Sequence, residues 1–357
     1  MITNIVLSRP TASGARFANK PGKRGKMMQG RKVTALMLLM LAVTIIAAAC
    51  GDKGAELPKT DSTGGEEQQG ETRTVEHAYG KTEIPVHPQR IAQYWMEDNL
   101  LSLEVPFIYS FNMPGYFLHD QIEKLGIKTD SAFPLNLEAL AAANPDLIII
   151  SQYAVDDEAG YAQLNKIAPT IAFDPNDWQG SIQKLGDALG VSDKATAVIA
   201  AHQEYINTVK NAITDKIGTD KTIALIRPSA KDLQVFFPGF SSITKTVYTE
   251  LGLAADDSIK KFEQDGSYEW GDDLSLEKIP ELQADYILSM YGSSISTEDE
   301  FEREAAEVKE FEKSPLWKDL PAVKNGQVTL VSGRHWMMSG AIADRMKLED
   351  VLKAVTN

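Results

Sequence analysis

The chain has 357 residues and a formal net charge of −14, with 50 acidic and 36 basic side chains. Nucleic acid is bound through clustered Lys and Arg, so a chain this acidic without a basic stripe is not expected to bind it. The single cysteine, Cys50, excludes an internal disulfide and points to another use for that residue.

The N-terminal segment has the pattern of a secretory signal peptide. Residues 1–32 contain eight Lys and Arg side chains and no acid, and the apolar run Val33–Ala49 follows and ends in small residues. This run has 17 residues, the short limit for a membrane span, so we expect a signal peptide over residues 1–49 rather than a transmembrane helix. Met27 or Met28 would give a start with a more usual signal length. Cleavage removes the eight cations and leaves a formal charge of about −22, too acidic to lie on anionic lipid.

Cys50 directly follows Ala47, Ala48 and Ala49 and precedes Gly51, and this pattern resembles a bacterial lipobox, although Ala47 stands where Leu is usual. The resemblance implies that Cys50 becomes the lipid-modified first residue of the mature protein. The membrane would then be reached through a covalent anchor. Residues 50–72 have almost no large apolar side chains after the cysteine, so we expect a flexible linker there.

The rest of the chain alternates short apolar runs with amphipathic stretches, which is typical of βαβ units around parallel sheets and predicts an α/β fold. The expected strands are Ile91–Tyr94, Phe107–Phe111, Leu147–Ser151, Ile171–Phe173, Ile223–Arg227, Gln234–Phe237, Tyr286–Met290 and Val328–Val331. The expected helices include Leu135–Ala143, Ala159–Ile167, Asp177–Leu189, Ser241–Leu251, Leu276–Leu282 and Glu298–Glu312.

One segment interrupts this alternation. From a capping residue at Ser192, the chain runs to Ile217 without Gly or Pro, and its apolar residues follow the helical period. A helix of that length, near the middle of the mature chain, could join two lobes. We therefore predict an N-terminal lobe over residues 73–190, a bridging helix over 191–217 and a C-terminal lobe over 218–357. The alternative is a packing helix inside one domain.

Five segments in this order resemble a known family: Thr74–Ala92, Asn136–Ser151, Leu164–Phe173, Leu274–Met290 and Ser314–Ser332. They are similar to the iron-siderophore and cobalamin class of ABC-importer substrate-binding proteins, over residues 73–357. The resemblance implies two α/β lobes with mainly parallel central sheets, a single rigid bridging helix, and a ligand cleft between the lobes. It implies a monomer on the extracytoplasmic face that captures a ferric siderophore, needs no cofactor, and delivers its ligand to the transmembrane subunits of an ABC permease.

Two glutamates are carried over from the resemblance. Glu138 and Glu277 occupy the positions where related proteins present one carboxylate per lobe to arginines of the permease. Charge complementarity of this kind sets the docking register. The alternative is that each is an acid in the first turn of a helix, where the helix dipole favours it.

Aromatic and cationic side chains gather at the carboxyl ends of the expected strands, where open α/β sheets bind ligands. A bulky amphipathic chelate needs apolar walls and a few polar groups. Each aromatic residue could instead belong to the core, and Arg227 could form an internal salt bridge. The expected ligand-binding residues are Tyr94, Trp95, Tyr109, Tyr153, Arg227, Phe237, Tyr291, Arg334, His335 and Trp336.

The charge of the residues at the expected strand ends limits which class of siderophore could bind. A ferric tris-catecholate is anionic and needs a cluster of cations, and three cations do not converge near the expected strand ends. A hydroxamate or a citrate-based chelate therefore fits better. Cobalamin and haem are the nearest alternatives, and His335 or Tyr291 could serve as the axial ligand of haem.

Two other classes of function are disfavoured. The five histidines are scattered, so no metal site is predicted. The sequence has no Gly-x-Ser-x-Gly, His-Glu-x-x-His, P-loop or glycine-rich dinucleotide motif, so we predict a carrier and no enzyme. A lipid-anchored enzyme with an unrecognised site is the remaining hypothesis.

Overall fold

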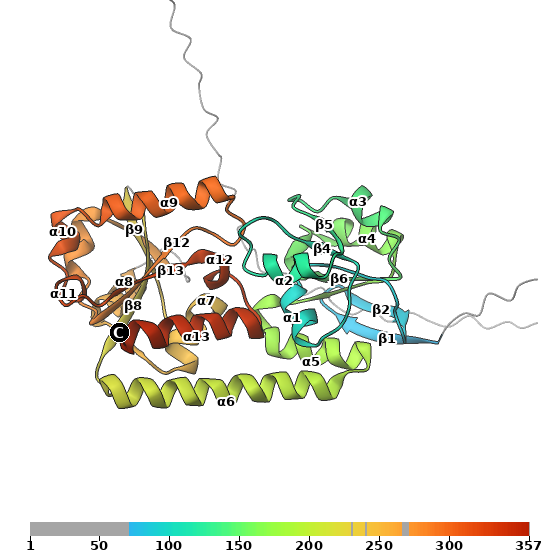
Figure 1. Cartoon of the computed structure of the whole chain (residues 1–357), viewed down its shortest axis with the longest axis horizontal. Helices are drawn as coiled ribbons and strands as arrows, with labels where there is room; N and C mark the ends of the chain where they lie inside the picture. The colour runs from blue at the N-terminus through green and yellow to red at the C-terminus, as the bar shows by residue number, and fades with distance from the viewer. Residues whose placement is uncertain (1–70, 230, 240, 266–270, 357) are drawn as a thin grey trace, which may run out of the picture. The chain divides into compact units, whose positions relative to one another are not determined.

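The computed structural model describes residues 71–229, 231–239, 241–265 and 271–356 (Figure 1). The predicted signal peptide, Cys50 and nearly all of the predicted linker lie outside these residues. The described chain opens with an antiparallel hairpin of β1 (Thr72–His77) and β2 (Gly80–Pro85). Within the described residues, no helix is both long enough and apolar enough to cross a bilayer.

The N-terminal lobe is built on a sheet of five strands in the order β5-β4-β3-β6-β7, all parallel. Helices cover both faces, so β3, β6 and β7 are buried along their whole length, as parallel strands require. One apolar cluster lies on each face of the sheet. The strands are β3 (Ile91–Tyr94), β4 (Tyr109–Phe111), β5 (Lys128–Asp130), β6 (Leu147–Ser151) and β7 (Thr170–Phe173).

Side-chain caps define where several helices of this lobe begin. Asn136 accepts a hydrogen bond from the Ala139 amide at the start of α3, and Asp157 caps α4 in the same way. The predicted helices of this lobe are present within two residues at each end. The helices are α1 (Glu97–Ser102), α2 (His119–Lys124), α3 (Leu137–Ala142), α4 (Glu158–Ile167) and α5 (Trp178–Leu189), with 3₁₀ turns η1 (Gln152–Ala154) and η2 (Pro175–Asp177).

The C-terminal lobe has a mixed sheet in the order β11-β9-β8-β12-β13, with β10 paired to β8. The pairs β8–β9 and β9–β11 are antiparallel, and the other pairs are parallel. Apolar clusters again cover both faces. The strands are β8 (Thr222–Pro228), β9 (Asp232–Phe236), β10 (Ala254–Ala255), β11 (Gly271–Ser275), β12 (Tyr286–Tyr291) and β13 (Val328–Ser332).

Two predicted helices of this lobe take other forms. The segment predicted as Ser241–Leu251 is a short α-helix followed by a π-helical turn, and the segment at Leu276 is a 3₁₀ helix that contains Pro280. The helices are α7 (Ser241–Lys245), η3 (Thr246–Glu250), α8 (Asp257–Asp265), η4 (Leu276–Glu281), α9 (Glu298–Phe311), α10 (Pro315–Lys318), α11 (Pro321–Lys324), α12 (Gly333–Trp336) and α13 (Ala341–Thr356).

The predicted bridging helix is present as α6 (Ser192–Ile217), with 26 residues. At 1.5 Å per residue it is about 39 Å long. Its first turns pack on α5, where Ala195 joins a core cluster of the N-terminal lobe, and Val209 joins a cluster of the C-terminal lobe (Figure 1). The predicted cap is wrong, because Val191 is the capping residue and Ser192 is the first residue of the helix.

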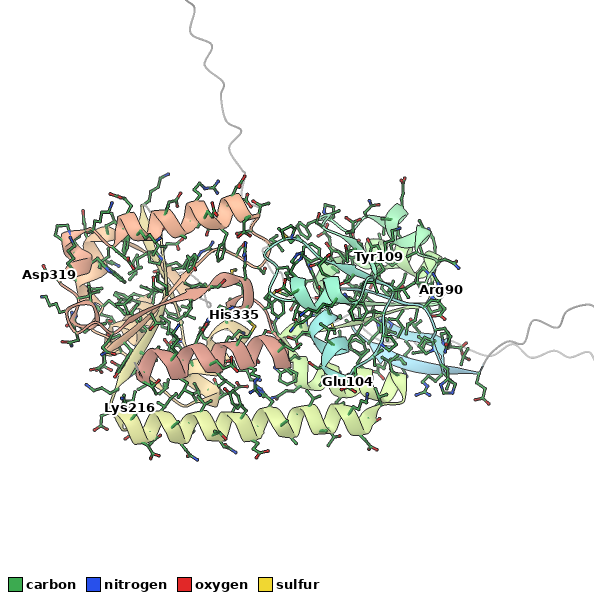
Figure 2. All side chains as sticks on the ribbon, viewed as in Figure 1. Arg90, Glu104, Tyr109, Lys216, Asp319 and His335 are labelled. Atoms are coloured by element: carbon green, nitrogen blue, oxygen red, sulfur yellow. The ribbon has the colours of Figure 1, made fainter. Side chains whose placement is uncertain are left out.

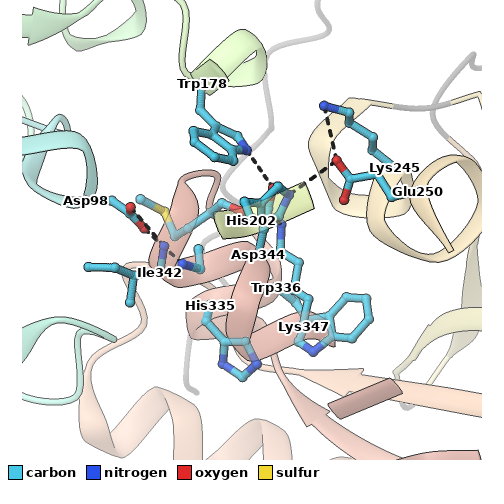
Figure 3. A network of polar contacts seen from close by, with 12 residues as sticks. Asp98, Trp178, His202, Lys245, Glu250, His335, Trp336, Ile342, Asp344 and Lys347 are labelled. Carbon is cyan, nitrogen blue, oxygen red and sulfur yellow. Dashed lines mark hydrogen bonds and ion pairs between the residues drawn. The ribbon is translucent and has the colours of Figure 1, made fainter. Parts of the chain in front are cut away.

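A second helix connects the lobes, and the sequence did not predict it. The N-terminus of α13 lies against α1 of the N-terminal lobe, where Asp98 accepts hydrogen bonds from the amides of Ile342 at 3.1 Å and Ala343 at 2.9 Å (Figure 3). Asp98 therefore caps a helix of the other lobe. Gly340 has φ of +151°, and an added Cβ would lie 2.1 Å from the Asp98 carboxyl carbon. Only glycine fits this close approach.

Candidate functional site

Two adjoining pockets lie between the lobes, at the carboxyl ends of strands from both sheets. The first has a volume of about 240 Å³, and Trp95 and Tyr153 of the N-terminal lobe face Met337 and Met338 across it. The second has a volume of about 440 Å³ and is lined by residues of both lobes, including Phe133 and Glu298. Because Ile295 lines both pockets, we treat them as one site, called the interlobe cleft.

Exposed apolar side chains concentrate at this cleft. Among the described residues, six large hydrophobic side chains are exposed, and three of them line the cleft: Phe133 is 61% exposed, Tyr153 54% and Ile295 39%. Trp95 stacks on Phe133 with ring centroids 5.3 Å apart. Apolar surface left in water marks a binding site more often than isolated exposed residues do.

Trp95 is held in an unusual conformation. It follows the last residue of β3 and has φ of +61°, in the left-handed region that disfavours a residue with a side chain by about 1 kcal/mol or more. Strain of this kind is retained at functional sites, where the surrounding structure fixes it. Here it turns the indole out of the sheet and into the cleft.

The floor of the first pocket covers buried acids. Tyr116 lines this pocket and lies beside Glu97, which is 1% exposed and whose carboxylate lies near the Tyr116 hydroxyl. Burial raises the pKa of Glu97 to about 8 and that of the neighbouring Asp98 to about 6. For Asp98, the bonds from the α13 amides partly offset the effect of burial. The side chains beneath Tyr116 are therefore acids, and they bring no positive charge to this part of the pocket.

Arg334 is a cation that lies between the lobes. Its Nη2 donates to the Glu298 carboxylate at 2.6 Å, and its guanidinium lies 3.8 Å from the centre of the Phe301 ring. On the other side it packs on Gly115 of the N-terminal lobe, where φ is +82° and an added Cβ would lie 2.1 Å from Nη2. The predicted ligand residue Arg334 is thus next to the cleft, with its charge already paired.

The structure brings only part of the predicted ligand set together. Trp95 and Tyr153 line the cleft, and Arg334 borders it. Arg227 and Tyr291 line a different pocket of about 320 Å³ that lies wholly in the C-terminal lobe. There Arg227 forms an ion pair of 2.8 Å with Glu304, the alternative left open by the sequence.

Five other predicted ligand residues are buried and line neither pocket of the cleft. Tyr94 and Tyr109 end or begin strands that are covered on both faces, and their side chains are buried in the apolar core. Figure 2 labels Tyr109 in the N-terminal lobe and His335 in the C-terminal lobe. Phe237 is likewise buried, in a core cluster of the C-terminal lobe. Trp336 donates from Nε1 to the Asp350 carboxylate at 2.8 Å inside the C-terminal lobe. His335 forms a hydrogen bond of 2.8 Å with the same carboxylate through Nε2. None of the five lines the cleft.

Several cleft residues were absent from the predicted set. Phe133 and Ile295 lie in loops outside the strands, and Met338 follows α12. A large apolar side chain in an otherwise polar loop, as in the sequence Ser294-Ile295-Ser296, was the available signal.

The two glutamates predicted to contact a permease are both exposed. Glu138 lies in the first turn of α3, and Glu277 lies in the first turn of η4. No ion pair to either carboxylate occurs within the described part of the chain. Both charges are therefore available to a partner, and their role stays a prediction.

One group of side chains in the described residues has the arrangement of metal ligands. The ligand atoms of His202, Glu250 and Asp344 lie within 4.8 Å of one another (Figure 3). Two lysines already supply the positive charge: Lys245 is 3.4 Å from Glu250, and Lys347 is 2.9 Å from Asp344. The group is best described as a charge-balanced network that joins α6, η3 and α13.

The chain is similar in sequence to siderophore-binding and iron-binding proteins of Bacillus subtilis. The chain is 28% identical over 337 residues to the "Probable siderophore-binding lipoprotein YfiY" of Bacillus subtilis, with 90% of this chain and 97% of that protein covered. It is 28% identical over 337 residues to the iron(3+)-hydroxamate-binding protein FhuD of the same organism, with 91% and 98% covered.

A solved structure from Bacillus subtilis has the same fold. It is a periplasmic binding protein component of a Fep/Fec-like ferrichrome ABC transporter, with a TM-score of 0.65, 25% identity, and coverage of 79% of this chain and 99% of that one. The family model described as "Periplasmic binding protein" matches residues 116–333, well over half of the sequence. On this match, the chain belongs to the periplasmic binding protein family.

Proposed function

We propose that this chain is the lipid-anchored, extracytoplasmic solute-binding component of an ABC importer, and that it carries a ferric siderophore in the interlobe cleft. The observation that carries the proposal is the concentration of exposed Phe133, Tyr153 and Ile295 on two adjoining pockets between the lobes. Such walls bind the organic face of a bulky chelate through burial of apolar surface. The siderophore and iron(3+)-hydroxamate ligands in the names of its relatives support the same class of ligand.

The charge of the cleft favours a chelate of the hydroxamate or citrate type. Among the described residues that line its two pockets there is no Lys or Arg, and two acids, Glu298 and Asp299, are present. The bordering Arg334 is paired with Glu298. A ferric tris-catecholate, with several negative charges, would meet no compensating cations here.

The alternatives of the same fold are haem and cobalamin. Haem would need an axial ligand at the cleft; neither candidate from the sequence lines it, and Tyr153, Met337 and Met338 are the side chains there that could serve. His335 is buried against Asp350, and Tyr291 lines the separate C-terminal pocket. Haem and cobalamin therefore serve as test ligands.

Delivery would use the exposed carboxylates of both lobes. Glu138 and Glu277 are exposed and form no ion pair with another described residue, as contact with permease arginines requires. Anchoring through Cys50 would keep the carrier at the membrane that holds the permease. The ligand is released unchanged, so the chain acts as a carrier and catalyses no reaction.

A fluorescence titration tests this function, because Trp95 lines the cleft and reports on ligand directly. The ligands are a ferric hydroxamate, ferric citrate, a ferric catecholate, haemin and cobalamin, with the iron-free hydroxamate as a control. We expect saturable quenching by the ferric hydroxamate or ferric citrate, and recovery of intact ligand afterwards. Tyr153→Ala should weaken binding about tenfold, or ~1.4 kcal/mol.

The matched control is Leu125→Ala, which truncates a side chain that is 46% exposed and lies outside the cleft. It should leave the dissociation constant unchanged. Saturation by haemin or cobalamin alone would replace the siderophore with that ligand. Failure of every ligand to saturate would refute the proposed function.

A further inference from the structure

The guanidinium of Arg334 is fixed on three sides. The Phe301 ring covers one face at 3.8 Å, and the backbone of Gly115 lies against the group from the opposite lobe. The carboxylate of Glu298 accepts from Nη2 at 2.6 Å. The Nε donor is buried and has no acceptor among the described residues. The cation is thus held in place with part of its hydrogen-bonding capacity unused.

Glu298 stands between this cation and the cleft. The Arg334 side chain is 13% exposed, whereas that of Glu298 is 55% exposed and lines the second pocket. Asp299, the next residue, lines the same pocket. A ligand in this pocket therefore meets carboxylates first, and the positive charge behind them is neutralised.

We propose that Glu298 masks Arg334 and so makes the interlobe cleft prefer ferric chelates without net negative charge. This inference rests on the proposed function and narrows its ligand class. A carboxylate on a chelate that takes the Nη2 donor would displace Glu298 and leave that acid and Asp299 facing an anionic ligand. Neutral trihydroxamates need no such exchange, and the apolar walls suffice to bind them. Ferric citrate should accordingly bind more weakly than a neutral trihydroxamate.

The experiment compares Glu298→Gln with a matched control, Glu302→Gln. Both variants remove one negative charge from α9, and Glu302 is exposed and lines neither pocket of the cleft. The ligands are a neutral ferric trihydroxamate and the same chelate carrying one added carboxylate. Their dissociation constants are measured by quenching of tryptophan fluorescence in the intact protein.

We expect Glu298→Gln to tighten binding of the carboxylate-bearing chelate by about tenfold or more, because the freed guanidinium forms a charge-assisted pair with it. Binding of the neutral chelate should change by less than about threefold, since its contacts are apolar. Glu302→Gln should change neither value. The double variant Glu298→Gln with Arg334→Gln should lose the gain, which separates unmasking of Arg334 from a general loss of acidity.

The possible outcomes separate failure of the masking role of Glu298 from failure of the proposed function. Equal gains in Glu298→Gln and Glu302→Gln would show a general charge effect and overturn the masking role. Tighter binding of the anionic chelate by the unmodified protein would also overturn it, while leaving the proposed function intact. Binding of neither chelate by any variant would refute the proposed function itself. If the double variant does not fold, the comparison of the two single variants still decides.

Discussion

The buried acid beneath the cleft makes a prediction about stability. Burial raises the pKa of Glu97 from 4.5 to about 8 in the folded chain. A raised pKa means that the folded state holds the proton more tightly than the unfolded state does. The contribution to stability is therefore complete below pH 4.5 and is lost as the pH rises through about 8. At pH 7 the loss is on the order of 3 kcal/mol, since one pKa unit corresponds to about 1.4 kcal/mol.

Glu97→Gln replaces the carboxyl with a neutral group of similar shape, so this pH dependence should disappear. We expect the variant to match the original chain near pH 4 and to be more stable by about 3 kcal/mol at pH 7. Urea unfolding at several pH values between 4 and 8 measures the difference. Asp98 titrates in the same range and is present in both proteins, so only its coupling to Glu97 remains in the comparison.

Glu83→Gln, at an exposed acid on β2, is the control and should have little effect on the free energy of unfolding. A difference for Glu97→Gln that is constant with pH, or that favours the original chain at pH 7, would refute the reasoning. Either result would mean that the carboxylate is ionised and well solvated or paired in the folded protein.

Three further predictions concern the joint between the lobes and the partner. Gly340→Ala should destabilise the protein by roughly 1–3 kcal/mol in urea unfolding, because the added methyl group collides with Asp98. Trp178→Phe keeps an aromatic ring but removes the indole Nε1, which donates to Asp344 of α13 at 2.7 Å, so unfolding should be easier by about 1–3 kcal/mol; an unchanged midpoint would contradict the role of that bond. The paired variant Glu138→Ala and Glu277→Ala should abolish iron uptake in cells while the purified protein keeps its affinity for ligand, and uptake at the normal rate would exclude both residues from docking.

The sequence predicted buried strands well and polar strands poorly. Ile91–Tyr94 and Leu147–Ser151 were predicted to the residue, since a strand covered on both faces is a continuous apolar run. Lys128–Asp130 was missed because an edge strand of three residues carries no such run. The two-residue strand β10 gave no pattern to read either.

The candidate site shows a sharper limit. Tyr94 and Trp95 are neighbours at the end of one strand, yet Tyr94 is 1% exposed and Trp95 lines the cleft. Successive side chains of a strand point to opposite faces of the sheet. The left-handed backbone at Trp95 breaks this alternation and turns its indole away from both faces. An aromatic pair in the sequence cannot reveal which member leaves the core. Two adjacent residues therefore have different environments, Tyr94 in the core and Trp95 at the cleft.

The connection between the lobes combines what a sequence can and cannot show. The long helix α6 was predictable from its own periodicity. The second connection depends on Asp98 meeting the amide of Ala343, 245 residues away, and on a glycine that permits the approach. Two helices that bind both lobes oppose a large hinge motion, because closure through a wide angle would break the cap on α13 and leave a buried carboxylate without its donors. The cleft is therefore formed before ligand arrives, and its selectivity must come from the side chains that already face it. For this reason a single carboxylate beside Arg334 can select between neutral and anionic ligands.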